Sequence, residues 1–74
     1  MWVTDDELTA LLRAYGTFHT RAGTFGEKAA ARMRDGDAGT AAMFASFAAS
    51  DARISEALRA LYSRALHAPS AQVA

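Results

Sequence analysis

A glycine-containing turn, Asp35-Gly36-Asp37-Ala38-Gly39-Thr40, separates two long segments in which apolar residues recur with helical spacing. Glycine readily adopts the left-handed conformation that often follows the last residue of a helix. An Asp or Thr placed just before the next helix can cap its first backbone N–H groups. We therefore expect two helices, near residues 5–35 and 38–67, that fold back on each other as an antiparallel hairpin.

The outer ends of both segments carry helix boundary signals. Thr4-Asp5-Asp6-Glu7 has a Thr followed three residues later by a Glu, which is the pattern of a capping box. Arg32 and Arg34 suit the negative end of the first helix dipole. Pro69 stops the second helix, because proline cannot continue a helix. These signals predict one helical domain over residues 1–68 and a disordered C-terminal tail over residues 69–74.

Apolar residues of each segment fall on one face of a helix. At about 100° per residue they occupy a sector roughly 140° wide. In the first segment they are Leu8, Leu11, Leu12, Tyr15, Phe18, Ala22, Phe25, Ala29 and Met33. In the second they are Met43, Phe44, Phe47, Ile54, Leu58, Leu61, Tyr62 and Ala65. Folding the chain at Gly36 places Phe25 opposite Phe47 or Ala48.

Three glycines interrupt the first segment. Gly16, Gly23 and Gly26 should each weaken a helix by about 1 kcal/mol relative to alanine. Thr24-Phe25-Gly26-Glu27 also resembles a second capping box. The alternative is therefore a three-helix arrangement with a break near Gly23, although the unbroken phase of the apolar face favours one continuous helix. The glycines either form a strip for close helix packing or mark a flexible joint.

Composition supports an all-α protein and excludes several classes of function. The chain has 74 residues, 51% of them hydrophobic, and alanine accounts for 19, whereas valine and isoleucine together number three. It contains no cysteine, and eight basic residues balance eight acidic ones. It has neither an apolar run of the roughly 18 residues that a membrane span needs nor the pattern of a signal peptide. We expect a cytoplasmic protein without membrane contact.

The width of the two apolar faces indicates a partner. A helix in a two-helix hairpin covers only a narrow seam, so part of each face stays exposed. Two hairpins that pack together as a four-helix bundle would cover more of it. We therefore expect a homodimer, or the binding of a helical segment of another protein. The candidate interface residues are Tyr15, Phe18, Phe25, Phe44, Phe47, Ile54, Leu58 and Tyr62.

Two polar residues, His19 and Asp51, fall within the apolar faces. The hairpin would bring them within about one helical turn of each other, so they are candidates for a polar pair in the seam. Alternatively, both lie at the edge of the seam and contact water. No serine is positioned to act as a nucleophile beside His19 and Asp51, and the two histidines of the chain are far apart. We therefore expect no catalytic site, no metal site and no cofactor.

Two functions are consistent with these features. The first is a small non-enzymatic interaction module, an adaptor or an inhibitor, that acts through an apolar helical face and self-associates. The second is a small dimeric nucleic-acid-binding regulator that uses Arg53, Arg59 and Arg64. Nucleic acid is the less favoured partner, because the net charge is zero.

Overall fold

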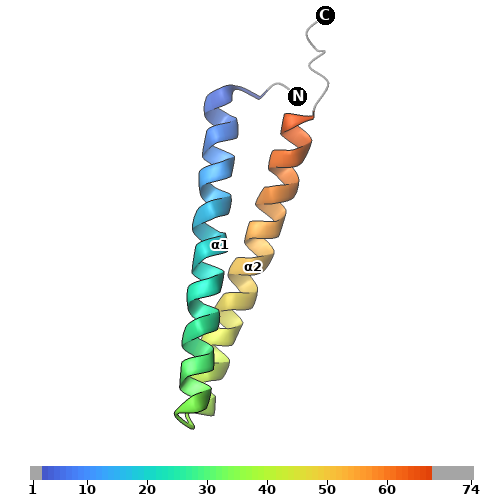
Figure 1. Cartoon of the computed structure of the whole chain (residues 1–74). Coiled ribbons are helices and arrows are strands. Elements are labelled where there is room, and N and C mark those ends of the chain that lie inside the picture. Colours follow the sequence, from blue (N-terminus) through green and yellow to red (C-terminus); the bar gives the residue numbers. More distant parts are fainter. Residues whose placement is uncertain (1–2, 68–74) are drawn as a thin grey trace, which may run out of the picture.

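The protein is a hairpin of two long helices. The computed structural model describes residues 3–67, in which helix α1 spans Asp5–Arg34 and helix α2 spans Ala38–Leu66 (Figure 1). The helices pack against each other, with the turn at one end and both outer helix ends at the other. The predicted all-α hairpin is confirmed. The predicted C-terminal tail, residues 69–74, lies outside the described residues.

Helix α1 begins with the expected capping box. The Glu7 backbone N–H donates to Thr4 Oγ1 at 3.1 Å, and the Thr4 backbone N–H donates to Glu7 Oε1 at 2.9 Å. These bonds satisfy backbone donors that the first turn leaves unpaired. The Thr4 backbone N–H, and secondly its hydroxyl, favour the ionised carboxylate and hold the pKa of Glu7 below its ordinary value.

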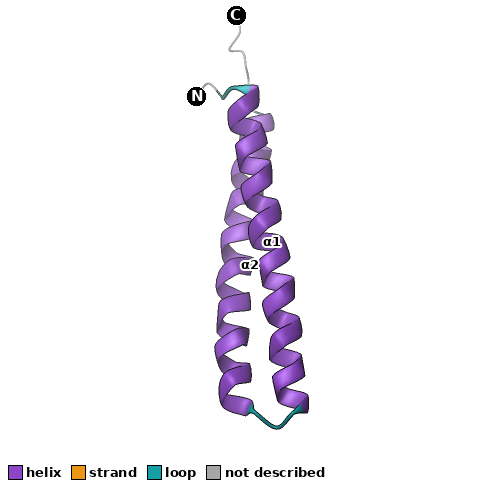
Figure 2. Ribbon diagram, turned by 90° about the vertical axis from the view of Figure 1, so that its left-hand side faces the viewer, coloured by secondary structure: helices purple, strands orange, loops and turns teal. Residues whose placement is uncertain are grey.

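The turn between the helices has the geometry that its sequence predicts. Gly36 has a φ of +79°, the left-handed conformation that L side chains rarely adopt. The Asp37 backbone N–H donates to the Arg32 carbonyl at 2.8 Å, and that of Gly36 donates to the Met33 carbonyl at 3.0 Å, which together form a Schellman motif. A short loop thus reverses the chain (Figure 2).

Asp37 also begins the second helix. Its carboxylate accepts the Thr40 backbone N–H at 3.1 Å and caps α2. The Thr40 hydroxyl and then its backbone N–H favour the ionised form and lower the pKa of Asp37.

Helix α1 is continuous through its glycines, so the alternative with a break near Gly23 is not formed. The apolar residues keep their phase along α1, and a continuous helix lets all of them meet α2. A Cβ atom added to Gly16, Gly23 or Gly26 would meet nothing within 4 Å. Packing of α1 against α2 therefore does not require these glycines.

The residues that face the other helix alternate three and four positions apart, which is the heptad spacing of a coiled coil. We call these residues the seam. On α1 they are Leu8, Leu11, Tyr15, Phe18, Ala22, Phe25 and Ala29, all half-buried. On α2 they are Ala41, Phe44, Ala48, Asp51, Ser55, Leu58, Tyr62 and Ala65, all buried or half-buried. Within residues 3–67, Ala41 is the only buried apolar residue, with 3% of its surface exposed.

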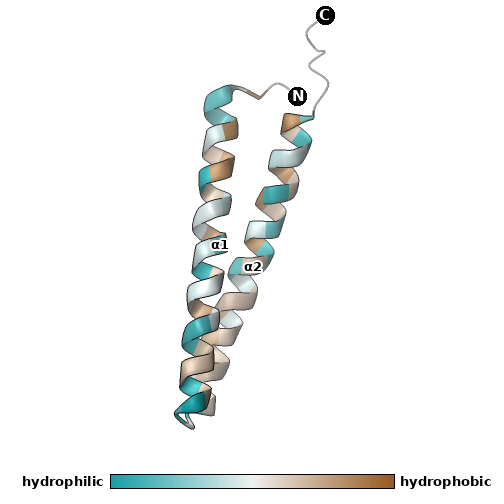
Figure 3. Cartoon of the chain, viewed as in Figure 1, coloured by the Kyte–Doolittle hydropathy of each residue, from teal (hydrophilic) through white to brown (hydrophobic). Residues whose placement is uncertain are grey.

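Aromatic rings set the register of the seam near the turn. The ring centroid of Phe25 lies 5.4 Å from that of Phe47 and 6.0 Å from that of Phe44. Phe44 and Phe47 are 6.5 Å apart in an edge-to-face arrangement. The predicted position of Phe25 opposite Phe47 is confirmed. Hydrophobic residues recur along both helices, whereas the turn is hydrophilic (Figure 3).

Candidate interaction surface

Helix α2 carries a second row of apolar side chains outside the seam. We call Met43, Phe47, Ile54 and Leu61 the outer stripe; each is 40–46% exposed. Phe47, Ile54 and Leu61 are spaced by seven residues, so they share one line along the helix. At about 100° per residue this line lies roughly 90° around α2 from the seam. One apolar row of α2 thus packs on α1, and the other stays largely exposed, although the Phe47 ring approaches that of Phe25.

A buried acidic residue lies in the seam beside the outer stripe. Asp51 is 5% exposed, and its Oδ2 atom lies 3.3 Å from Nε of Arg21, whose side chain is 53% exposed. This Oδ2 atom makes no hydrogen bond of good geometry, so the contact is an ion pair with imperfect alignment. A buried charge is costly unless it is paired. Arg21 and Asp51 therefore favour one register of the hairpin.

His19, the expected partner of Asp51, lies elsewhere. It is exposed, and its ring stacks on that of Tyr15 with centroids 5.3 Å apart. Residues two apart on a helix point about 200° away from each other, so His19 and Arg21 occupy opposite flanks of α1. Asp51 is on the flank of Arg21. The structure thus gives Asp51 a different partner from the one that the sequence suggested.

An open hollow joins the ion pair to the outer stripe. It is lined by Arg21, Phe25, Phe47, Ser50 and Asp51, from both helices. The ion pair with Asp51 is made through Nε of Arg21, and arginine has five N–H donors in all. The remaining donors, together with the Ser50 hydroxyl, are available to a ligand at the edge of the hollow.

Basic side chains of α1 border the outer stripe. The guanidinium carbon of Arg21 lies 5.2 Å from the ring centroid of Phe18 and 6.0 Å from that of Phe25. Nζ of Lys28 lies 5.7 Å from the ring centroid of Phe44 on α2. Because Arg21 also pairs with Asp51 of α2, both cations lean towards α2 and form a basic edge beside the outer stripe.

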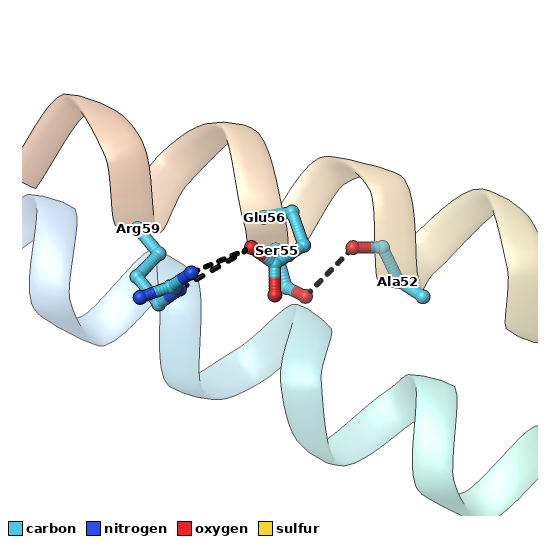
Figure 4. Close-up of polar contacts among 4 residues, drawn as sticks. All are labelled: Ala52, Ser55, Glu56 and Arg59. Atoms are coloured by element: carbon cyan, nitrogen blue, oxygen red, sulfur yellow. Dashed lines mark hydrogen bonds and ion pairs between the residues drawn. The ribbon is translucent and has the colours of Figure 1, made fainter.

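A second basic edge runs along α2. Arg53 and Arg64 are exposed and lie about 70–90° around α2 from the centre of the outer stripe, on the side away from α1. Glu56 points to another side of α2, where its Oε2 pairs with Nη2 of Arg59 at 3.1 Å (Figure 4). The outer stripe thus lies between two basic edges.

The opposite side of the hairpin has a different surface. Gly16, Gly23 and Gly26 lie about 140–220° around α1 from Arg21, so they face away from the basic edge. Leu12 and Met33 are exposed on this same flank. This face of α1 therefore combines small residues with isolated large ones.

The expected interface residues divide into two groups. Six of them are half-buried in the seam: Tyr15, Phe18, Phe25, Phe44, Leu58 and Tyr62. Phe47 and Ile54 are exposed on the outer stripe. The sequence pattern places Met43 and Leu61 on the apolar face but not among the candidate interface residues. The seven-residue spacing of Phe47, Ile54 and Leu61 is the sequence signal that indicates a separate row.

Comparison of the chain with known proteins does not assign it to a family: no family model, curated protein or solved structure matches it. In residues 3–67, neither helix has the length and apolar character needed to cross a bilayer. Over the same range there is no cluster of three or more His, Asp or Glu side chains suited to a metal ion. The surface of the hairpin therefore provides the evidence about function.

Proposed function

We propose that the protein is a small non-enzymatic interaction module, an adaptor or inhibitor, that acts through the outer stripe of α2. The observation that carries this proposal is the row of four large apolar side chains that the folded chain leaves 40–46% exposed. Fully burying one such side chain from water contributes about 1.5–3 kcal/mol. Because each of the four is already more than half buried, a partner that covered the remainder would gain roughly 3–5 kcal/mol in total. Such a gain is sufficient to make the surface a binding site once other contacts add to it.

The polar groups of the seam support a structural role over a catalytic one. Asp51 is engaged by Arg21, and the Ser55 hydroxyl donates to the Ala52 carbonyl at 2.9 Å (Figure 4). Asp51 joins the two helices and the Ser55 hydroxyl is bonded to the backbone of its own helix, so neither is presented as a free base or nucleophile.

Self-association into a four-helix bundle is the second part of the proposal. It is supported by the thin core: within residues 3–67 Ala41 is the only buried apolar residue, and large apolar side chains on both helices are exposed. Small domains of this kind commonly gain stability by association. Two hairpins that packed through the flank with Leu12 and Met33 would form a bundle with a larger shared core and leave the outer stripe free.

A dimeric nucleic-acid-binding regulator receives less support. Arg59 is paired with Glu56 and lies about 120° around α2 from Arg53, so the three arginines of α2 do not form one patch. Retention on a heparin column that falls steeply with salt would favour this alternative. We expect the chain to elute at low salt.

Sedimentation equilibrium over a wide concentration range tests self-association. We expect the average mass to rise with concentration from that of the 7.9 kDa monomer towards twice that value. A chain that stays monomeric at every concentration would contradict self-association. A chain that also binds no helical peptide would contradict the interaction module as a whole.

A further inference from the structure

We infer that the outer stripe receives an amphipathic helix of another protein whose apolar row is flanked by acidic side chains. This inference rests on the proposed function and specifies its partner. Three features of the described residues support it: the spacing of the outer stripe, the charge on both of its edges, and the hollow beside Phe47.

The spacing selects a helix as the partner. Phe47, Ile54 and Leu61 recur every seven residues, which is the period of helix-on-helix seams and the period of the seam within this hairpin. At 1.5 Å per residue the stripe from Met43 to Leu61 is about 27 Å long. A partner helix of roughly 18–20 residues would match this length.

The charge selects an acidic partner. Arg21 and Lys28 border the stripe on the α1 side, and Arg53 and Arg64 border it on the other side. On this face, Asp51 is buried and already paired with Arg21. Glutamates or aspartates beside the apolar row of a partner would therefore meet basic side chains on both edges.

The same charge disfavours a second copy of the chain at this site. If two outer stripes packed antiparallel, the edge with Arg53 and Arg64 would meet the same edge of the other copy. If they packed parallel, that edge would meet Arg21 and Lys28. A basic edge meets a basic edge in both orientations, and like charges across an interface oppose binding.

The hollow provides a specific contact for one acidic side chain. It lies between Arg21, Ser50 and Phe47, directly beside the outer stripe. The exposed half of the Arg21 side chain can donate hydrogen bonds to a carboxylate while Nε stays on Asp51. Charge-assisted bonds of this kind would fix the register of the partner helix.

A membrane surface is the competing partner for an apolar row with basic edges. Helices that lie on membranes present a broad apolar face. The outer stripe is a single narrow row, and α1 flanks it on one side with Arg21 and Lys28. These features favour a helix over a lipid surface, and vesicles therefore serve as an arm of the test.

The test uses three labelled peptides of about 21 residues that share a leucine heptad row and differ only in the flanking residues: Glu, Gln or Lys. Fluorescence anisotropy measures their affinity for the full chain at low salt. We expect the Glu peptide to bind about tenfold or more tightly than the Lys peptide, with the Gln peptide between them. Added salt should reduce the difference.

Matched variants locate the binding site. Leu61→Asp lies on the outer stripe and Leu12→Asp lies on the opposite flank of α1, and the two leucines are similarly exposed. We expect Leu61→Asp to weaken binding of the Glu peptide about tenfold or more and Leu12→Asp to leave it unchanged. The double variant Lys28→Glu with Arg64→Glu leaves two basic and two acidic side chains on the edges, so it should abolish the preference for the Glu peptide over the Lys peptide. Circular dichroism checks that each variant is folded.

Each contrary outcome overturns a defined part of the proposal. Equal binding of the Glu, Gln and Lys peptides would overturn the acidic partner but leave the interaction module in place. Loss of self-association in Leu61→Asp but not in Leu12→Asp would show that a second copy occupies the stripe. Binding to phosphatidylcholine–phosphatidylserine vesicles without binding to any peptide would show that the stripe contacts lipid.

Discussion

The two rows of α2 reverse the usual relation between burial and hydrophobicity, in which large apolar side chains are the most buried. The seam row contains the most buried residues of the described chain, and these are small or polar: Ala41, Asp51 and Ser55. The outer stripe consists of large apolar residues, and they are exposed. Small seam residues let α1 and α2 approach closely, and the large seam residues of α2, Phe44, Leu58 and Tyr62, are half-buried beside them. The hairpin is therefore held by a thin seam, and the four large apolar side chains of the outer stripe stay exposed for a partner.

The largest effect should come from adding volume to the seam. Ala41→Leu places a large side chain where the helices are closest, because Ala41 is only 3% exposed. We expect urea denaturation to show a loss of about 2–3 kcal/mol in the free energy of unfolding. Ala42→Leu is the matched control, since Ala42 is exposed next to it on α2. Similar losses in both variants would contradict a close-packed seam.

The second-largest effect should come from truncating a leucine, and its cost should differ between the two rows. Leu58 is half-buried in the seam, and Leu61 is on the outer stripe. We expect Leu58→Ala to cost about 2 kcal/mol, and Leu61→Ala less than about 1 kcal/mol, in urea denaturation of the monomer at low concentration. If Leu61→Ala costs as much as Leu58→Ala, the outer stripe already contributes to the fold.

The third effect concerns Gly23, which lies on the flank of α1 that faces away from Arg21 and the outer stripe. A Cβ atom at position 23 would meet nothing within 4 Å. Gly23→Ala should therefore stabilise the hairpin by about 0.5–1 kcal/mol, as measured by thermal unfolding, because alanine favours the helix. A fall in stability or in self-association would instead show that another chain approaches the α1 backbone closely at this glycine.

The smallest effect concerns the helix caps and leaves both rows intact. The pKa values of Glu7 and Asp37 are lowered from their ordinary values of 4.5 and 3.8. Their contribution to stability is complete above those values and is lost as the pH falls through the lowered folded pKa values. Thermal unfolding should therefore show a decrease in stability below about pH 4. Glu7→Gln should make this decrease shallower, and an unchanged pH profile would contradict a role for the Glu7 carboxylate.

Local signals in the sequence predict most of the fold. The capping box at Thr4 and Glu7, the left-handed Gly36 and the Asp37 cap are short-range features, and each appears where it was expected. The register of Phe25 with Phe47 follows once the position of the turn is known. The continuity of α1 through Gly23 depends on packing along the whole helix. Local sequence signals therefore allow both a continuous helix and a break near Gly23.

The division of the apolar residues between two rows is not predictable from hydrophobic periodicity alone. Phe44 and Phe47 fall in the same broad sector, yet only Phe44 is half-buried and Phe47 is exposed. A small rotation of each helix about its axis decides which residues enter the seam. The same rotation places Asp51 beside Arg21 instead of His19. Side-chain volumes of both helices together determine that rotation, so the rotation cannot be predicted from the hydrophobic pattern of one helix.

The most direct test of the outer stripe is a map of amide chemical shifts in the ¹⁵N-labelled chain while the Glu-flanked peptide is added. We predict that the largest changes follow α2 through Phe47, Ile54 and Leu61 and extend to Arg21 on α1. Changes centred on Leu12 and Met33, or spread evenly over both sides of the hairpin, would contradict the assignment of the outer stripe as the interaction surface.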